Sequence, residues 1–502
     1  AYTLLIENVI YNNAPVSPYK SFLFQGHVLD ENGNKMSKSK GNVLEAKELL
    51  EKYPVDLVRF YFMWKASPIE PLNFSTKELM SRPYQVISTL YHLHTFYKQN
   101  SEYDKFNVEE STIEWAKKKN LLTPPDVWLL SKLQRMITRT TETNDSCRFH
   151  ESAKSIEDFL INSLSQIYIP IIKSELWDED DSKKDRRFTI YAILAKTLKT
   201  INILIHPFAP FTSQYLYKTV FSNKENILLE SWPKIDSSLI DEKVETAFDL
   251  LKETVSVTSA ARMKGKLKRR WPLNQAMICV NKGEKQVLES LSELVKSQMN
   301  IQNYEIFEID NSEGMEQYLE LKEKGLPVVP KIELERSAIG PKAKQDMGKL
   351  LKMFSETDPE SIIDELKKNN NYTFQIGDNS VVLDKEDFIV DFEVNEKYQF
   401  AKRQNLIVVI SLERDNEMMS KGLIKDLARR IQTLRKERGF NPTDILERAS
   451  ILELDEESLN LIKDKTEDIA FLVRVKNVDF TESCKNYKDD DIDGLKIRIA
   501  VE

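Results

Sequence analysis

Residues 26–42 read Gly26-His-Val-Leu-Asp-Glu-Asn-Gly-Asn-Lys-Met-Ser-Lys-Ser-Lys-Gly-Asn42, and this stretch decides how the N-terminal part of the chain folds. The apolar segment that leads into it, residues 21–29, predicts a strand. Residues 30–33 are mostly types that favour a chain reversal, and a basic, serine-rich loop follows. A helix is expected over residues 44–53, with Asn42 as its cap. The sequence therefore predicts a strand–loop–helix unit of the α/β type.

The loop in this unit carries Lys35-Met36-Ser37-Lys38-Ser39, whose chemistry suits a polyphosphate. Lys35 and Lys38 can place two compact ammonium charges where negative charge develops as pyrophosphate leaves. Ser37 and Ser39 add hydroxyl donors. A solvated Lys/Ser loop is the alternative interpretation, and the order of strand, turn, loop and helix weighs against it.

Size and composition indicate a soluble, multidomain protein. The chain has 502 residues, 41% of them apolar and 30% charged, with a net charge of −8 and a mean hydropathy of −0.45. That length predicts three or four domains. No apolar run approaches the roughly 18 to 20 residues that span a bilayer, and the first residues lack a secretory n-region. The chain begins at Ala1, within what reads as a regular element, so we expect a fragment.

Cysteine and histidine spacing argues against a structural metal or a disulfide framework. Cys147, Cys279 and Cys484 lie far apart, which fits a reducing cytoplasm. His92 and His94 are two residues apart, on different sides of a helix. No zinc site is expected.

The organisation of the chain predicts a mixed α and α/β fold in four parts. Residues 1–75 carry the strand–loop–helix unit, and residues 76–235 are helical, with apolar residues at three- and four-residue steps such as Val127, Leu130, Leu133 and Ile137. The helix near Leu204 should end at Pro207. Residues 236–380 predict a linker helix and a small α/β region. Residues 381–502 predict a second small α/β domain, with strands near 406–412 and 451–454.

The Lys35–Ser39 loop resembles the KMSKS signature of the class I aminoacyl-tRNA synthetases, in which this loop closes over ATP. The resemblance implies a Rossmann-type catalytic domain ending near residue 75, an ATP site at Lys35, Met36, Ser37, Lys38 and Ser39, and a catalytic role for Lys35 and Lys38 toward ATP and its Mg²⁺. Asp56 and Arg59 resemble the family's Asp-x-x-Arg stretch, either as ligand contacts or as a structural ion pair.

Later segments narrow the resemblance to the isoleucyl branch, of the archaeal or eukaryotic type. Residues 125–133 and 206–210 are similar to helices of the anticodon-binding bundle, and residues 260–273 and 427–439 to stretches of isoleucyl enzymes. The implied function is ATP-dependent attachment of isoleucine to its tRNA by a cytoplasmic monomer that engages neither DNA nor membrane. A valyl or leucyl enzyme and a non-catalytic tRNA-binding derivative remain alternatives. The family's His-x-Gly-His segment is absent, so this chain alone is not expected to activate isoleucine.

Two basic runs are candidate contacts for tRNA phosphates, with solvated faces as the alternative. Trp271 ends the first run and could stack on a base. The candidates are Arg262, Lys264, Lys266, Lys268, Arg269 and Arg270 in the first run, and Arg429, Arg430 and Arg435 in the second. Trp128, at helical spacing, is expected in the core instead.

Overall fold

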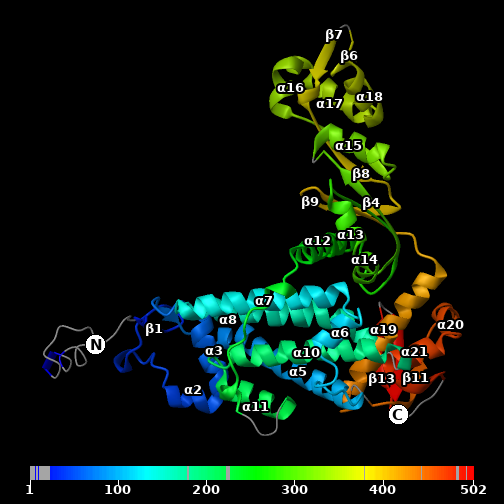
Figure 1. The fold of residues 1–502 in the computed structure, drawn as a ribbon. Helices are drawn as coiled ribbons and strands as arrows, with labels where there is room; N and C mark the ends of the chain where they lie inside the picture. The colour runs from blue at the N-terminus through cyan, green and yellow to red at the C-terminus, as the bar shows by residue number, and fades with distance from the viewer. Residues whose placement is uncertain are drawn as a thin grey trace. The chain divides into compact units, whose positions relative to one another are not determined.

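The computed structural model describes residues 6, 9–10, 23–177, 180–221, 226–311, 313–377, 379–441, 444–481, 486–492 and 495–502. The chain forms two compact units, Ala1–Thr246 and Ala247–Glu502 (Figure 1). The first unit therefore ends a little beyond the boundary at residue 235 that the sequence predicted. Residues 21–22 of the predicted first strand, and Cys484, lie outside the described residues.

The first unit opens with a small α/β element that carries the Lys35–Ser39 loop. β1 (Val28–Leu29) pairs in parallel with β2 (Leu72–Asn73), so the predicted strand is much shorter than expected. Between them lie the 3₁₀ turn η1 (Lys38–Lys40), α2 (Ala46–Lys52) and α3 (Val55–Lys65), and α4 (Thr76–Leu79) follows β2. Their apolar faces share one core: Leu49, Leu57, Val58, Tyr61, Leu72, Phe74 and Leu79.

A helical bundle fills the rest of the first unit, as predicted. Its helices are α5 (Arg82–Tyr103), α6 (Ile113–Lys118), α7 (Pro124–Asp145), α8 (Phe149–Asp158), α9 (Ile169–Leu176), α10 (Lys184–Ile205) and α11 (Pro210–Val220), and the π-helical segment η2 (Phe159–Tyr168) joins α8 to α9. Trp128 on α7 is fully buried, which confirms its core position.

Helix α10 is the most apolar long helix of the bundle, and residues Asp181–Ile205 are long and apolar enough, by length and composition alone, to cross a membrane. The expectation that no such segment exists was therefore too strict. However, 78% of its most apolar window is buried inside the bundle, as in the core helix of a folded domain. The helix ends at Ile205, two residues before Pro207, as predicted.

The second unit begins within α12 (Glu242–Lys264) and contains a four-stranded sheet of order β4-β3-β10-β9. β3 (Leu273–Asn281) pairs in parallel with β4 (Ile301–Ile309) and antiparallel with β10 (Leu406–Ser411), which pairs with β9 (Tyr398–Arg403). The crossover from β3 to β4 holds two short helices, α13 (Glu284–Glu289) and α14 (Ser292–Met299).

Between β4 and β9 the chain forms a helix-rich insertion with two strand pairs. Its elements are α15 (Gly314–Glu323), β5 (Val328–Leu334), α16 (Arg336–Ala343), α17 (Met347–Glu356), α18 (Pro359–Asn369), β6 (Asn371–Ile376), β7 (Asn379–Asp384) and β8 (Phe388–Val394). β6 pairs with β7 and β5 with β8, both antiparallel.

The C-terminal part folds around α19 (Asn416–Glu437) and a sheet of order β12-β11-β14-β13. Its other elements are β11 (Leu446–Leu452), α20 (Glu456–Ile462), α21 (Thr466–Val473), β12 (Val475–Phe480), β13 (Lys488–Ile492) and β14 (Leu495–Val501). The predicted boundary at residues 380/381 is wrong, because it cuts β7. The predicted strand at 406–412 is β10, which joins the earlier sheet through β3 rather than the sheet of β11.

Candidate functional site

The Lys35–Ser39 loop starts from a backbone segment that is held tightly against the chain beyond α3. The Gly26 N–H donates to the carbonyl of Pro68 at 2.7 Å. A Cβ atom added to Gly26 would lie 1.9 Å from the carbonyl oxygen of Glu70, so only glycine permits this approach. Together with the β1–β2 pairing, this contact sets the position from which the loop departs.

The turn before the loop is organised by Asp30. Its Oδ1 accepts the main-chain N–H groups of Asn32 and Asn34 at 3.0 and 2.8 Å, and its Oδ2 accepts the side-chain amide of Asn42 at 2.8 Å. Hydrogen bonds from Asn42 and from the Asn34 N–H hold the pKa of Asp30 below its ordinary value. The prediction that Asn42 caps the next helix is wrong: the N-cap of α2 is Glu45, and the Asn42 side chain turns back to the loop.

The two lysines of the loop are available to a ligand. Lys35 and Lys38 are exposed, and within residues 23–177 and the other described ranges no acidic side chain lies within ion-pair distance of either. Met36 packs on the core below the loop, and the hydroxyls of Ser37 and Ser39 lie 3.2 Å apart. An ordered loop with unpaired ammonium groups on both sides of a half-buried methionine can bind a polyphosphate.

Asp56 and Arg59 on α3 do not form the ion pair that was one of the two predictions for them. Asp56, only 2% exposed, accepts the N–H of Thr212, and the Arg59 guanidinium donates to the carbonyl of Pro207 at 3.0 Å. Arg59 therefore binds the connection between α10 and α11, within the 206–210 motif, and Asp56 binds the first turn of α11. Burial lowers the pKa of His206 in that motif, although the nearby Asp56 carboxylate acts to raise it.

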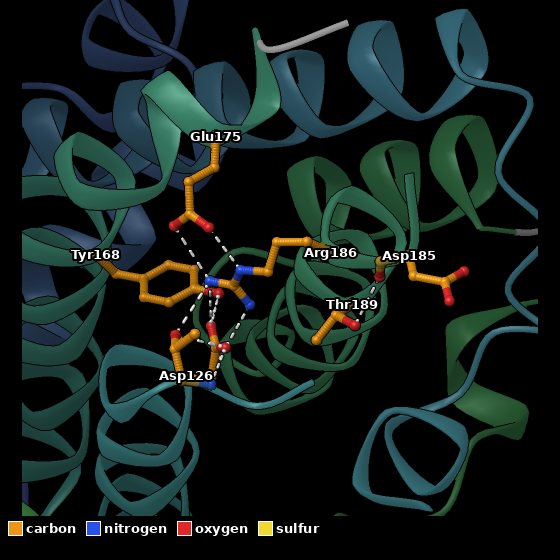
Figure 2. A network of polar contacts seen from close by, with 7 residues as sticks. Asp126, Tyr168, Glu175, Asp185, Arg186 and Thr189 are labelled. Carbon is orange, nitrogen blue, oxygen red and sulfur yellow. Dashed lines mark hydrogen bonds and ion pairs between the residues drawn. The ribbon is translucent and has the colours of Figure 1, made fainter. Parts of the chain in front are cut away.

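A buried polar network ties three helices of the bundle together (Figure 2). Arg186 on α10 binds Asp126 on α7 at 2.5 Å and Glu175 on α9 at 2.6 Å, and the Tyr168 hydroxyl donates to Asp126 at 2.8 Å. The sequence patterns did not predict this network. The sequence held only a local signal, the capping box of Thr123 and Asp126 at the start of α7.

The structure divides the predicted tRNA-contacting cations into buried and accessible groups. Arg262 is 2% exposed, and its guanidinium donates to the carbonyls of Lys268, Trp271, Met299 and Asn300. Arg435 is 5% exposed and binds the carbonyls of Val473, Arg474, Asn441 and Asp444. Burial lowers the pKa of Arg262 to about 10. Both guanidinium groups are committed to the fold and are not free to bind a phosphate.

Two further candidates are paired with acidic side chains. Arg270 binds Asp426 at 3.1 Å, and Arg430 binds Asp490 at 2.9 Å. The indole of Trp271 donates to Asp426 at 3.1 Å, and its ring lies against Gly422, so it is not an open stacking platform. Lys264, Lys266, Arg269 and Arg429 are exposed, and Lys268 is half-buried.

Histidines and cysteines do not gather into a metal site in the part of the chain that the structure describes, where no group of three or more His, Cys, Asp or Glu side chains could hold an ion. His94 is fully buried in the bundle, between the carbonyl of Leu90 and the side chain of Asn202.

Two family models match the chain. The model described as "tRNA synthetases class I (I, L, M and V)" matches residues 3–75, and "Anticodon-binding domain of tRNA ligase" matches residues 126–278. The first covers the Lys35–Ser39 loop, and the second covers the bundle from α7 onward. These matches confirm the predicted fold class.

Curated isoleucine–tRNA ligases match nearly the whole chain. The enzyme of Methanopyrus kandleri is 27% identical over 96% of this chain and 43% of its own length. Those of Clostridium tetani and Saccharolobus solfataricus are 28% and 29% identical, over 100% and 97% of this chain and 46% and 48% of theirs. The chain thus spans less than half the length of these relatives.

Two solved structures are more distantly similar. A LeuRS–tRNA–LeuAMS ternary complex of Agrobacterium radiobacter K84 is 21% identical, with a TM-score of 0.36, over 48% of this chain and 28% of that one. Methionyl-tRNA synthetase of Mycobacterium tuberculosis with methionyl-adenylate is 18% identical, with a TM-score of 0.33, over 38% and 36%.

Proposed function

We propose that this chain, which belongs to the class I aminoacyl-tRNA synthetases, is part of an enzyme that attaches isoleucine to its tRNA using ATP. The isoleucine–tRNA ligases that match nearly the whole chain support isoleucine rather than valine or leucine. The chain would supply the phosphate-binding loop and the surfaces that bind tRNA. The remaining parts of the active site would come from outside these 502 residues.

In the first step of the proposed reaction, the carboxylate of isoleucine attacks the α-phosphorus of ATP, and pyrophosphate leaves. Lys35 and Lys38 would face the phosphates and offset the charge that builds on the leaving group. In the second step, a hydroxyl of the terminal tRNA ribose attacks the adenylate carbonyl, and AMP leaves. Mg²⁺ would enter with ATP, and no resident zinc is proposed.

The observation that carries the proposal is that Lys35 and Lys38 are exposed and have no acidic partner among the described residues. They stand on an ordered loop, above a core that anchors Met36. Unpaired cations on a fixed loop are suited to an anionic ligand.

For tRNA, we propose phosphate contacts from the exposed cations Lys264, Lys266, Arg269 and Arg429, together with the half-buried Lys268. Arg262 and Arg435 are not proposed as tRNA contacts, because their N–H groups already donate to main-chain carbonyls inside the fold. The bundle from α5 to α11 would face the anticodon arm. We further propose that the protein works as a monomer in the cytoplasm, where the free thiols of Cys147 and Cys279 would stay reduced.

The test is binding of this chain to tRNAs for isoleucine, valine and leucine at one moderate salt concentration. We expect preference for isoleucine tRNA, lost when its anticodon is changed. Preference for valine or leucine tRNA would move the assignment to that enzyme. Equal binding to all three, falling steeply with salt, would mean that only phosphate contacts hold the RNA and would contradict the isoleucine assignment.

A further inference from the structure

The Lys35–Ser39 loop is closed at its base by two side chains, Asp30 at its entrance and Asn42 at its exit. The Asn42 amide donates to Asp30 Oδ2 at 2.8 Å, and Asp30 Oδ1 accepts the N–H groups of Asn32 and Asn34. One carboxylate therefore organises the incoming turn and also holds the outgoing chain. We call this pair the Asp30–Asn42 latch.

Asn42 also holds the backbone on both sides of Met36. Its Oδ1 accepts the N–H of Ser37 at 2.9 Å, and its Nδ2 donates to the carbonyl of Lys35 at 3.3 Å. These two groups belong to the two peptide units that flank Met36, whose side chain packs on the core below. With both peptide units held, the directions in which Lys35 and Lys38 leave the backbone are restricted as well.

We infer that Asp30 and Asn42 are positioning residues. They order the loop before the ligand arrives, so that Lys35 and Lys38 already stand where a polyphosphate binds. This inference rests on the proposed function of the loop. Neither latch residue needs to touch the ligand. A loop that is ordered beforehand binds more tightly, because the ligand does not have to offset the entropy of ordering it. Without the latch the same positive charges would remain, on a looser backbone.

The loop contains a matched control for Asn42. Asn34 is also an asparagine of this loop, but its side-chain amide is exposed and lies 3.5 Å from Asp30 Oδ2. Its ordering contribution comes from its main-chain N–H, which any residue except proline supplies. Asn34→Ala should therefore leave the loop ordered, whereas Asn42→Ala removes three side-chain hydrogen bonds at once.

The experiment measures the binding of inorganic tripolyphosphate to the full chain at fixed low ionic strength. This probe carries the phosphate chain without adenine or amino acid, so it tests the loop alone. We expect Asn42→Ala to weaken binding about tenfold, as the loss of three hydrogen bonds of about 0.5 kcal/mol each predicts. Lys35→Ala and Lys38→Ala should weaken it at least as much, and Asn34→Ala should bind like the unaltered chain. Amide exchange in a peptide covering residues 34–42 should accelerate in Asn42→Ala only.

A second variant, Asn42→Asp, gives a pH signature that a change in folding alone would not give. It places two carboxylates at hydrogen-bond distance, so the latch is broken when both are ionised and restored when one keeps its proton and donates. Its binding, expressed relative to the unaltered chain at each pH, should be weak at pH near 8 and recover toward pH 5. The same ratio for Asn42→Ala should stay low throughout.

The outcomes separate this inference from the function on which it rests. If Asn42→Ala binds tripolyphosphate like the unaltered chain while the lysine variants do not, the latch inference is wrong and the phosphate role of the loop stands. Unchanged amide exchange in Asn42→Ala would also overturn it. If the lysine variants themselves bind normally, the proposed function of the loop fails, and the inference fails with it.

Discussion

Asp56 accepts a hydrogen bond from the main-chain N–H of Thr212, a residue 156 positions further along the chain. Thr212 lies in the first turn of α11, whose N-cap residue, Ala209, has no side-chain acceptor. Asp56 on α3 therefore does from a distance what a capping aspartate does locally, and its charge suits the positive end of the helix. The element that carries the Lys35–Ser39 loop is in this way joined to the bundle.

Replacing Asp56 tests this distant cap. Asp56→Ala should lower the free energy of unfolding of the first unit by about 0.5 to 2 kcal/mol, the range for lost caps. Asp56→Asn keeps an acceptor oxygen and should lose less. Urea unfolding followed by circular dichroism, with amide exchange at residues 211–214, measures both. Equal stability of Asp56→Ala and the unaltered chain would show that the hydrogen bond does not hold α11.

The network around Arg186 should be among the costliest places to alter in the bundle. Arg186→Ala leaves the fully buried Asp126 without its charged partner, and breaking such a pair destabilises by about 3 to 5 kcal/mol. The matched control is Lys119→Ala, which removes an ion pair with Asp185 whose side chains are 48% and 48% exposed. That change should cost about 0.2 to 1 kcal/mol. Similar losses for the two variants would contradict a structural role for the network.

Buried His94 should make stability depend on pH. Burial lowers its pKa from near 6.5 to about 4 in the folded chain, so between these values the unfolded chain binds more protons, and stability falls as the pH is lowered. His94→Gln should reduce that slope between pH 6.5 and pH 5. His92→Gln, a change on the exposed side of the same helix, should leave it unaltered. Denaturant midpoints at several pH values supply the comparison, and parallel slopes for all three proteins would exclude His94 as the cause.

Two arginines of one basic run should behave in opposite ways. Arg269→Ala should weaken tRNA binding and reduce the slope of log affinity against log salt by about 1, with no change in stability. Arg262→Ala should destabilise the second unit, because four main-chain carbonyls lose their donor. Salt-dependent tRNA binding and thermal unfolding distinguish them. A stable Arg262→Ala protein with weakened tRNA binding would reverse these two roles.

Local patterns predicted much of the fold. The three- and four-residue spacing from Val127 to Ile137 marks α7, and Pro207 marks the end of α10, because helix periodicity and proline geometry act within a few residues. The predicted first strand was too long, since a short parallel pair leaves no local signature. The predicted domain boundary at 380/381 was wrong because β10 pairs with β3, more than a hundred residues earlier. No local sequence pattern indicates which distant strand a given strand will pair with.

The sequence by itself determined the family resemblance, the bundle helices and the presence of Lys35 and Lys38 on a loop after a turn. Only the tertiary structure decided that Arg262 is buried while Arg269 is exposed, and that Asn42 latches the loop instead of capping α2. The physical reason is the same in both cases. A guanidinium or an amide forms whichever hydrogen bonds the folded chain brings within reach, and those partners are fixed by backbone segments that meet only after folding.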